Sequence, residues 1–305
     1  MIQIKNLKSG LNIFKALSSE VRIDIVQLLQ ENPRLNLDEI AKRLNLTNGA
    51  ITQHVKKLEE SGIVGIETSG GKHGLQKHCF VTDNEILINI QGENQLENVY
   101  EIDIKAGHYI AFHAEPTCGL ATKDSIIGEF DNPRYFADPA HVNAEIVWLS
   151  EGYLEYWIPN YIKPWQTVEE IQVIAELGSE APSYNNDYPS DIYFSLNDAE
   201  LGYWTSPGDF GDEKGKQNPA WWPPHLNQYG MLKLIRVTNE GSFIDGFRIS
   251  DVTISDVCSS HRDEFRLRFA APSHAKNRGG LTIYGSNFGH FQQDITARVI
   301  YSNRR

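Results

Sequence analysis

The chain has 305 residues, of which 40% are hydrophobic and 22% are charged, a composition typical of globular proteins that excludes a disordered chain. Its formal net charge of −12 argues against nucleic-acid binding by the chain as a whole. It contains no apolar run of about eighteen residues and no signal-peptide core, so we expect a cytoplasmic protein with no membrane partner.

Charge is distributed unevenly along the chain. Residues 1–90 hold 11 Lys and Arg against 10 Asp and Glu, whereas the remaining residues hold 17 against 30. Within residues 42–78, six basic residues occur with only three acidic ones. A surface that contacts phosphate needs such a local excess of positive charge, so the objection from the net charge does not apply to this segment.

The first predicted helix spans residues 19–30 and is followed by Pro33. Its apolar residues recur with the spacing of an amphipathic helix at Val21, Ile25, Leu28 and Leu29. A second helix is predicted at residues 37–44. Asn36 precedes it and Glu39 follows three residues later, which is the pattern of a capping box.

A third helix is predicted to begin after the short turn at residues 45–47, with Thr47 as its cap and Gly62 just past its end. Its inward face carries Ile51, Val55 and Leu58. Two short helices joined by so tight a turn make a helix-turn-helix motif, whose second helix enters the major groove of DNA.

The hydrophobic period changes after Gly62. Residues 63–66 are predicted to form a strand, residues 69–71 a turn and residues 77–82 a return strand. A basic hairpin directly after a recognition helix is a wing. We therefore predict a winged helix-turn-helix domain over residues 1–92.

Three segments of this domain resemble the ArsR-type family of bacterial repressors, in order and at the family's spacing. They are Leu17–Arg22, Leu37–Ala41 and Thr47–Val64. The resemblance covers roughly residues 10–85. It implies a homodimer that reads a pseudo-palindromic operator in double-stranded DNA and releases it when an effector binds.

The DNA contacts are predicted from the outward face of the recognition helix and from the wing. Amide side chains pair with adenine edges, a threonine meets a thymine methyl or a phosphate, and a lysine meets phosphate or guanine. On the helix the candidates are Asn48, Thr52, Gln53 and Lys56, with His54 at the border of the face. On the wing they are Lys72, His73 and Lys77.

Metal sensing, which is common in this family, is not predicted for this chain. Soft metal ions bind tightly to paired thiolates. Residues 37–44 contain no cysteine, and Cys79, Cys118 and Cys258 are isolated from one another in the sequence. Their odd number also fits a reducing compartment. We expect neither a metal nor a cofactor.

An all-β domain is predicted over residues 98–305, after a polar linker at residues 91–95. Apolar and polar residues alternate in short runs around residues 100–104, 265–269 and 295–299, and Gly, Pro, Asn and Asp separate these runs. This pattern is typical of an antiparallel sandwich or jelly roll. As a β-sandwich with aromatic loops, the domain resembles the carbohydrate-binding jelly rolls. The predicted fold class of the whole chain is α+β, with two domains.

A ligand site is predicted in the segment 203–230, which is rich in Gly and Pro and too long for a plain connection. Aromatic faces stack on the C–H surfaces of sugars, while Asp and His bond hydroxyl groups. The predicted saccharide contacts are Trp204, Asp209, Trp221, Trp222 and His225.

The sequence predicts a one-component transcription regulator in which the β domain senses a small ligand. Two alternatives remain open: a protein-interaction or oligomerisation module without a ligand, and a carbohydrate-active enzyme. The sequence has no Gly-x-Ser-x-Gly motif, phosphate-binding loop or dinucleotide fingerprint, so we expect no enzymatic activity.

Overall fold

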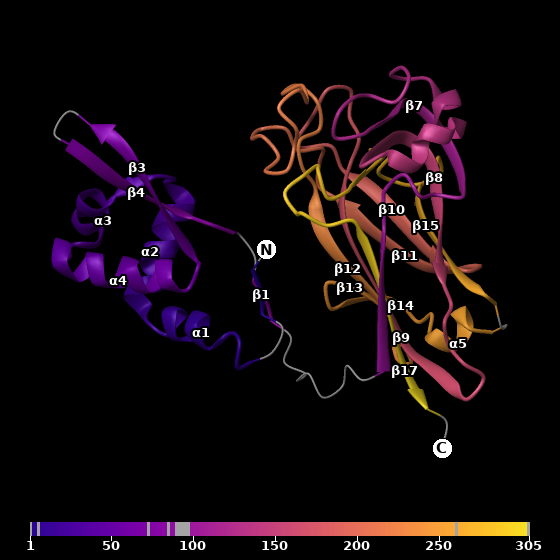
Figure 1. The fold of residues 1–305 in the computed structure, drawn as a ribbon, viewed down its shortest axis with the longest axis horizontal. Coiled ribbons are helices and arrows are strands. Elements are labelled where there is room, and N and C mark those ends of the chain that lie inside the picture. The colour runs from indigo at the N-terminus through magenta and orange to yellow at the C-terminus, as the bar shows by residue number, and fades with distance from the viewer. Residues whose placement is uncertain are drawn as a thin grey trace. The chain divides into compact units, whose positions relative to one another are not determined.

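The computed structural model describes residues 2–4, 7–71, 74–83, 86–88, 98–259 and 262–303. The chain divides into two compact units, residues 1–97 and residues 98–305 (Figure 1). None of the helices in these ranges has the length and apolar composition needed to span a bilayer. The predicted linker at residues 91–95 lies outside the described residues.

The described part of the smaller unit is built from four helices and a small antiparallel sheet. The helices are α1 (Leu11–Leu17), α2 (Glu20–Glu31), α3 (Leu37–Leu44) and α4 (Asn48–Glu60). The sheet has the order β2 (Leu35–Asn36), β4 (Gly74–Val81) and β3 (Val64–Gly71). A separate parallel pair joins β1 (Ile2–Ile4) to β5 (Ile86–Ile88).

Side-chain and backbone caps fix the ends of the two central helices. Asn36 accepts a hydrogen bond from the Glu39 N–H, and the Glu39 carboxylate accepts one from the Asn36 N–H, so the predicted capping box is confirmed. After α4, Gly62 has a φ of +78°, and the N–H groups of Gly62 and Ile63 donate to the carbonyls of Glu59 and Leu58. This Schellman motif ends the recognition helix at the predicted glycine.

Within residues 98–259 and 262–303, the larger unit contains twelve strands, and every strand pair there is antiparallel. The strands are β6 (Val99–Ile104), β7 (Ala111–Ala121), β8 (Ile146–Pro159), β9 (Gln166–Gly178), β10 (Ser190–Leu196), β11 (Ala199–Ser206), β12 (Met231–Thr238), β13 (Gly241–Ile244), β14 (Phe247–Ser250), β15 (Glu264–Ala271), β16 (Leu281–Tyr284) and β17 (Ile295–Asn303). Short helices connect some of them: η2 (Pro133–Ala137), η3 (Pro139–Asn143) and α5 (Ile254–Val257).

These strands form two layers with one apolar core between them (Figure 1). One layer has the order β7-β8-β15-β10-β11 and the other the order β6-β17-β9-β12-β13-β14, while β16 pairs with both β8 and β9. Inward-facing residues of both layers meet in the core, for example Phe194 and Phe269 of the first layer and Val173 and Val299 of the second.

The predicted α+β class, a winged helix-turn-helix followed by an antiparallel β domain, is confirmed. The predicted helices at residues 19–30 and 37–44 match α2 and α3 closely. The alternating run at residues 265–269 is also confirmed, because Phe265, Leu267 and Phe269 are buried. Two elements were not expected from the sequence, namely α1 and the β1–β5 pair.

Candidate nucleic-acid interface and the predicted ligand loop

The recognition helix α4 has one buried and one exposed face. Ile51, Val55 and Leu58 are at most 1% exposed and belong to the core of the small unit. Because side chains return to the same face every three to four residues, the opposite side is left to solvent. The residues on that exposed side are Asn48, Thr52, Gln53 and Lys56.

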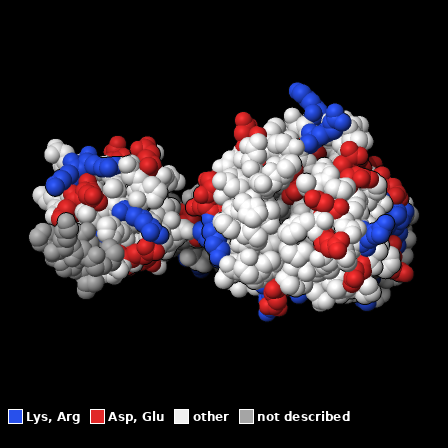
Figure 2. Space-filling view, turned by 90° about the horizontal axis from the view of Figure 1, so that it is seen from above, with Lys and Arg blue, Asp and Glu red and all other residues white. Residues whose placement is uncertain are grey.

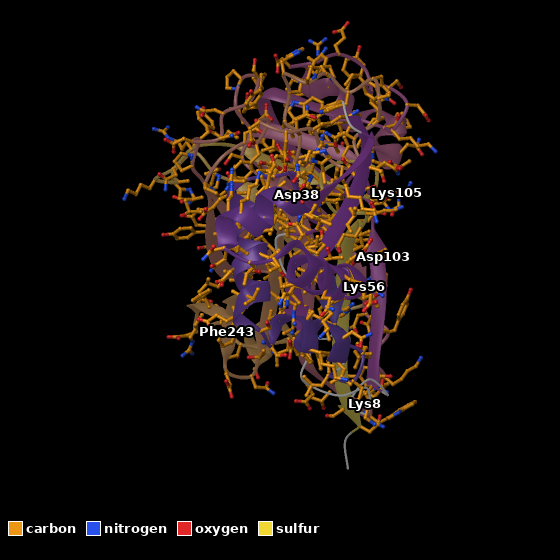
Figure 3. All side chains as sticks on the ribbon, turned by 90° about the vertical axis from the view of Figure 1, so that its left-hand side faces the viewer. Lys8, Asp38, Lys56, Asp103, Lys105 and Phe243 are labelled. Atoms are coloured by element: carbon orange, nitrogen blue, oxygen red, sulfur yellow. The ribbon has the colours of Figure 1, made fainter. Side chains whose placement is uncertain are left out.

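Two residues of the exposed face are held by local hydrogen bonds. Asn48 Nδ2 donates to the Asp38 carboxylate in the first turn of α3, and the Thr52 hydroxyl donates to the Asn48 carbonyl at 2.7 Å. Asp38 is labelled in Figure 3. Asp38 was not predicted as part of this surface, because a first-turn acid is normally explained by the helix dipole alone.

Lys56 keeps its charge available at the surface. Its Nζ lies 3.8 Å from Glu60 Oε1, and both side chains are more than half exposed. Exposed ion pairs of this kind contribute little, so this pair does not prevent Lys56 from contacting a phosphate. Lys56 is also labelled in Figure 3.

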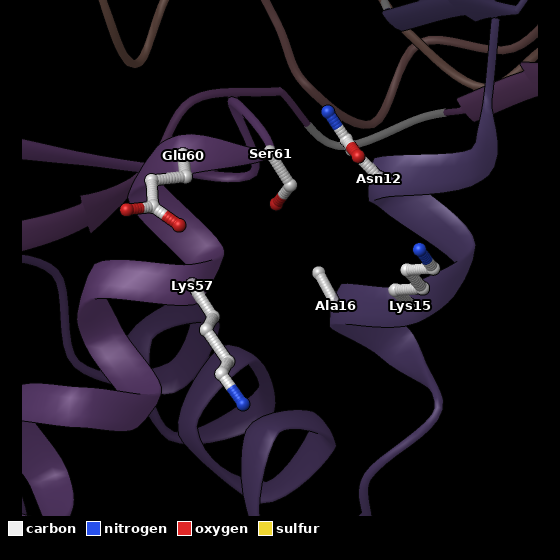
Figure 4. Close-up of a pocket in the computed structure, with 6 residues that line it drawn as sticks. All are labelled: Asn12, Lys15, Ala16, Lys57, Glu60 and Ser61. Atoms are coloured by element: carbon white, nitrogen blue, oxygen red, sulfur yellow. The ribbon is translucent and has the colours of Figure 1, made fainter.

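His54 lies at the edge of this face, next to two cations. Partial burial lowers the pKa of its imidazole, and the positive charges of Arg22 and Lys57 lower it further. Arg22 itself is buried and donates to the carbonyls of Lys15 and Ala16 at the end of α1. The neighbouring pocket of about 260 Å³ separates α1 from α4, with Asn12 and Lys15 on one side and Lys57 and Glu60 on the other (Figure 4).

Only part of the predicted wing contact is described. Lys77 on β4 is exposed and pairs in register with Thr68 of β3. Lys72 and His73 lie outside the described residues. Lys77 is therefore the predicted DNA contact on the wing whose position the structure describes.

In the predicted ligand loop, two residues are core residues and not surface contacts. Trp222 is 3% exposed and packs edge-to-face against Trp148 and Phe288. Its Nε1 donates a hydrogen bond to the Asn227 carbonyl at 2.8 Å. Asp209 is fully buried, and burial raises the pKa of its carboxyl to about 8. The prediction of exposed stacking and hydroxyl contacts is wrong for these two residues, because the loop folds inward at both.

Trp204 is also placed differently from the prediction. It lies on β11, packs its half-buried ring against the main core, and has Lys233 Nζ 4.7 Å above the ring centroid. Lys233 belongs to β12 of the other layer. Trp204 therefore helps to close the two layers, and the irregular loop begins only after Ser206.

Trp221 and His225 remain at the surface of the loop. Trp221 is 37% exposed and donates from Nε1 to the Lys123 carbonyl at 2.6 Å. His225 is exposed and lines a pocket of about 400 Å³ together with Phe130, Trp148 and Glu180. Burial and the neighbouring Asp209 charge raise the pKa of the Glu180 carboxyl. Of the five predicted ligand residues, His225 thus lines an open pocket.

Known proteins resemble the N-terminal part of the chain. Residues 18–64 match the winged helix-turn-helix DNA-binding family. An uncharacterised HTH-type transcriptional regulator of Methanocaldococcus jannaschii is 33% identical over 79 residues, which is 24% of this chain and 82% of that protein.

Two solved structures are more distant. Reduced HlyU from Vibrio cholerae is 24% identical with a TM-score of 0.22, and the match covers 25% of this chain and 74% of HlyU. The Agl-KA catalytic domain is 7% identical with a TM-score of 0.30, and the match covers 67% of this chain and 27% of that domain. The match to the Methanocaldococcus regulator spans most of that protein, and the chain belongs to the HTH-type transcriptional regulators with a winged helix-turn-helix DNA-binding domain.

Proposed function

We propose that this protein is a one-component regulator of the ArsR type, in which the N-terminal unit binds operator DNA as a homodimer and the β domain senses a small ligand. The observation that carries the proposal is the two-faced recognition helix. Its inward face is completely buried, while Asn48, Gln53 and Lys56 stand on the exposed face. Amide groups read adenine edges and a lysine binds phosphate, so this face has the chemistry of base readout.

The uneven charge distribution supports different functions for the two units. The acidic excess lies in the β domain, and Figure 2 shows acidic and basic side chains interspersed over its visible face. A surface with excess negative charge is repelled by the phosphate backbone. DNA binding is therefore confined to the N-terminal unit, which leaves the β domain for another task.

We propose that this task is sensing, with a saccharide as the effector, and that the β domain is not an enzyme. A ligand changes DNA affinity only if it binds the DNA-free and DNA-bound forms with different affinity. In the repressor arrangement the ligand binds the DNA-free form more tightly, so it releases the operator. This regulation takes place in the cytoplasm, where operator and metabolite are both present.

The test selects a binding site and then measures coupling. The full chain is used to enrich duplexes from a random pool, and the affinity of the enriched duplex is compared with that of a scrambled duplex. We expect one palindromic sequence to bind at least about a hundredfold more tightly than the scrambled one. Equal binding of both duplexes would contradict operator recognition. An operator affinity that no saccharide of a broad panel changes would contradict the sensor assignment alone.

A further inference from the structure

The outer face of the layer β7-β8-β15-β10-β11 carries a row of residues that crosses all five strands. The register aligns them directly, in the order His113, Tyr153, Ala270, Tyr193 and Tyr203. Their chain neighbours Leu154, Phe269 and Phe194 belong to the core. Because successive side chains on a strand point to opposite faces, the row points away from the core.

The row is interrupted by a hollow at its centre. Neighbouring strands lie about 4.8 Å apart, so the backbones that carry Tyr153 and Tyr193, on either side of Ala270, are separated by roughly 9.6 Å. Gly152 also lines the hollow, and a Cβ there would lie 1.9 Å from the His113 carbonyl oxygen. Together with Ala270, Gly152 lines a pocket of about 420 Å³, here named the sheet pocket.

The aromatic walls of the sheet pocket are held in place by their neighbours. The ring of Tyr193 stacks on Tyr203 with centroids 5.0 Å apart and planes at 30°, and the His274 ring packs edge-to-face against it with centroids 5.5 Å apart. On the opposite wall, Arg268 Cζ lies 4.3 Å from the centroid of the Tyr153 ring. A site whose walls are already ordered loses little conformational entropy when a ligand binds.

Arg268 is itself fixed by a buried acid. Its Nε and Nη2 donate to Glu155 Oε2 at 3.0 and 2.7 Å, and the Glu155 side chain is only 8% exposed. The Arg268 side chain remains 42% exposed and lines the sheet pocket. The rim adds hydrogen-bonding groups of both kinds, from Ser195, Glu200, Glu151, His113, Ser273 and His274.

We propose that the sheet pocket binds a neutral saccharide, with the C–H face of one pyranose ring on Tyr193 and its hydroxyl groups bonded by Arg268 and the rim. This proposal rests on the proposed sensor function and moves its ligand from the loop to the sheet. An aromatic face beside mixed donors and acceptors suits a ring that is apolar above and below and polar at its edge.

The charges around the sheet pocket select against other ligand classes. Glu151, Glu155 and Glu200 outnumber the single guanidinium of Arg268, so a phosphate or sulfate ligand is repelled. A purely apolar ligand would desolvate the polar rim without offering it hydrogen bonds, which is unfavourable. A neutral polyol carries no charge that the carboxylates would repel, and its hydroxyl groups offer hydrogen bonds to the polar rim.

The experiment measures binding of named sugars to the full chain by isothermal titration calorimetry. The panel contains methyl β-galactoside, maltotriose, cellotriose, xylotriose and chitotriose. Two variants alter the pocket from its solvent side: Ala270→Leu fills the hollow, and Tyr193→Ala removes the stacking face. Because both positions point away from the core, the fold is expected to persist, and near-ultraviolet circular dichroism verifies it. The matched controls are the loop variants Trp221→Ala and His225→Ala.

We expect at least one sugar to bind with a Kd below about 1 mM, and Ala270→Leu and Tyr193→Ala each to weaken it at least about tenfold. The loop variants should bind that sugar as the parent does. Weaker binding in the loop variants, or unchanged binding in the pocket variants, would show that the sheet pocket is not the saccharide site. The proposed sensor function would not be affected by that result. If no sugar in the panel binds the parent chain, the saccharide assignment is overturned, and operator recognition is unaffected because it is measured separately.

Discussion

The Asn48 side chain at the start of the recognition helix donates a hydrogen bond from Nδ2 to the Asp38 carboxylate in the first turn of α3. This bond connects the two helices of the helix-turn-helix motif on the side that is exposed to solvent. It orients an amide suited to reading an adenine edge. It also places a negative charge beside a surface that would approach phosphate.

Two substitutions of Asp38 separate these effects. Asp38→Asn removes the charge but keeps an acceptor for Asn48. We therefore expect it to bind operator and scrambled DNA more tightly by the same factor, so that the ratio of the two affinities is unchanged. Asp38→Ala also releases the amide, and the ratio of operator to scrambled affinity should fall at least about fivefold, since a good base contact is worth about 1–3 kcal/mol. Fluorescence anisotropy with both duplexes measures the ratio. The same ratio in both variants would mean that Asp38 does not position Asn48 for readout.

Alanine substitutions of the adjacent Trp221 and Trp222 in the predicted ligand loop should differ sharply in their effect on the free energy of unfolding. Trp222→Ala leaves a cavity between Trp148 and Phe288, so we expect a loss of about 3–5 kcal/mol in the free energy of unfolding. Trp221→Ala, which removes a partly exposed ring, should cost about 1 kcal/mol. Urea denaturation followed by tryptophan fluorescence isolates the β domain, because all six tryptophans lie there. Equal losses would place Trp222 at the surface.

The buried Asp209 carboxyl should make the β domain less stable as the pH rises. Burial raises its pKa from 3.8 to about 8, and among the described residues its Oδ1 has no hydrogen-bond partner. The folded state therefore holds a proton that the unfolded state releases, so stability falls between about pH 4 and pH 8 and this contribution is lost above the folded pKa. Glu176, whose pKa burial raises to about 7, acts in the same direction.

Asp209→Asn tests this pH dependence. The amide cannot ionise, so the free energy of unfolding should depend less steeply on pH, and at about pH 8 the variant should be more stable than the parent. Chemical denaturation at about pH 5, 6.5 and 8 gives the comparison. A parent protein whose stability increases with pH over this range would show that Asp209 is charged in the folded state.

Local signals predicted the DNA-binding unit well. The Asn36 and Glu39 pair, the turn at residues 45–47 and Gly62 each fix one helix end through neighbouring residues, and such effects are visible in a sequence. The helix α1 was missed because its seven residues are too short for a clear helical period. The β1–β5 pair joins strands more than eighty residues apart, which no local pattern reveals.

The ligand site could not be predicted in the same way. Trp222 and Asp209 look like exposed loop residues in the sequence, but the loop turns them into the core. There the Asn227 carbonyl accepts a hydrogen bond from the Trp222 indole, and the Ala181 N–H donates to Asp209 Oδ2. Conversely, Tyr153, Tyr193 and Ala270 come from three strands that are far apart in the chain. Only the register of the sheet brings them into one row, and alternation alone does not give the order of strands.

The central claim, that the exposed face of α4 reads a DNA sequence, is tested most directly at Gln53. Affinities of the parent, Gln53→Ala and Lys56→Ala for the selected and scrambled duplexes are measured over a range of salt concentrations. We expect Gln53→Ala to lose about 1–3 kcal/mol of sequence preference, and Lys56→Ala to weaken both duplexes alike and to lower the salt slope by about one. If Gln53→Ala keeps the full preference of the parent, the recognition helix does not read the operator through this face.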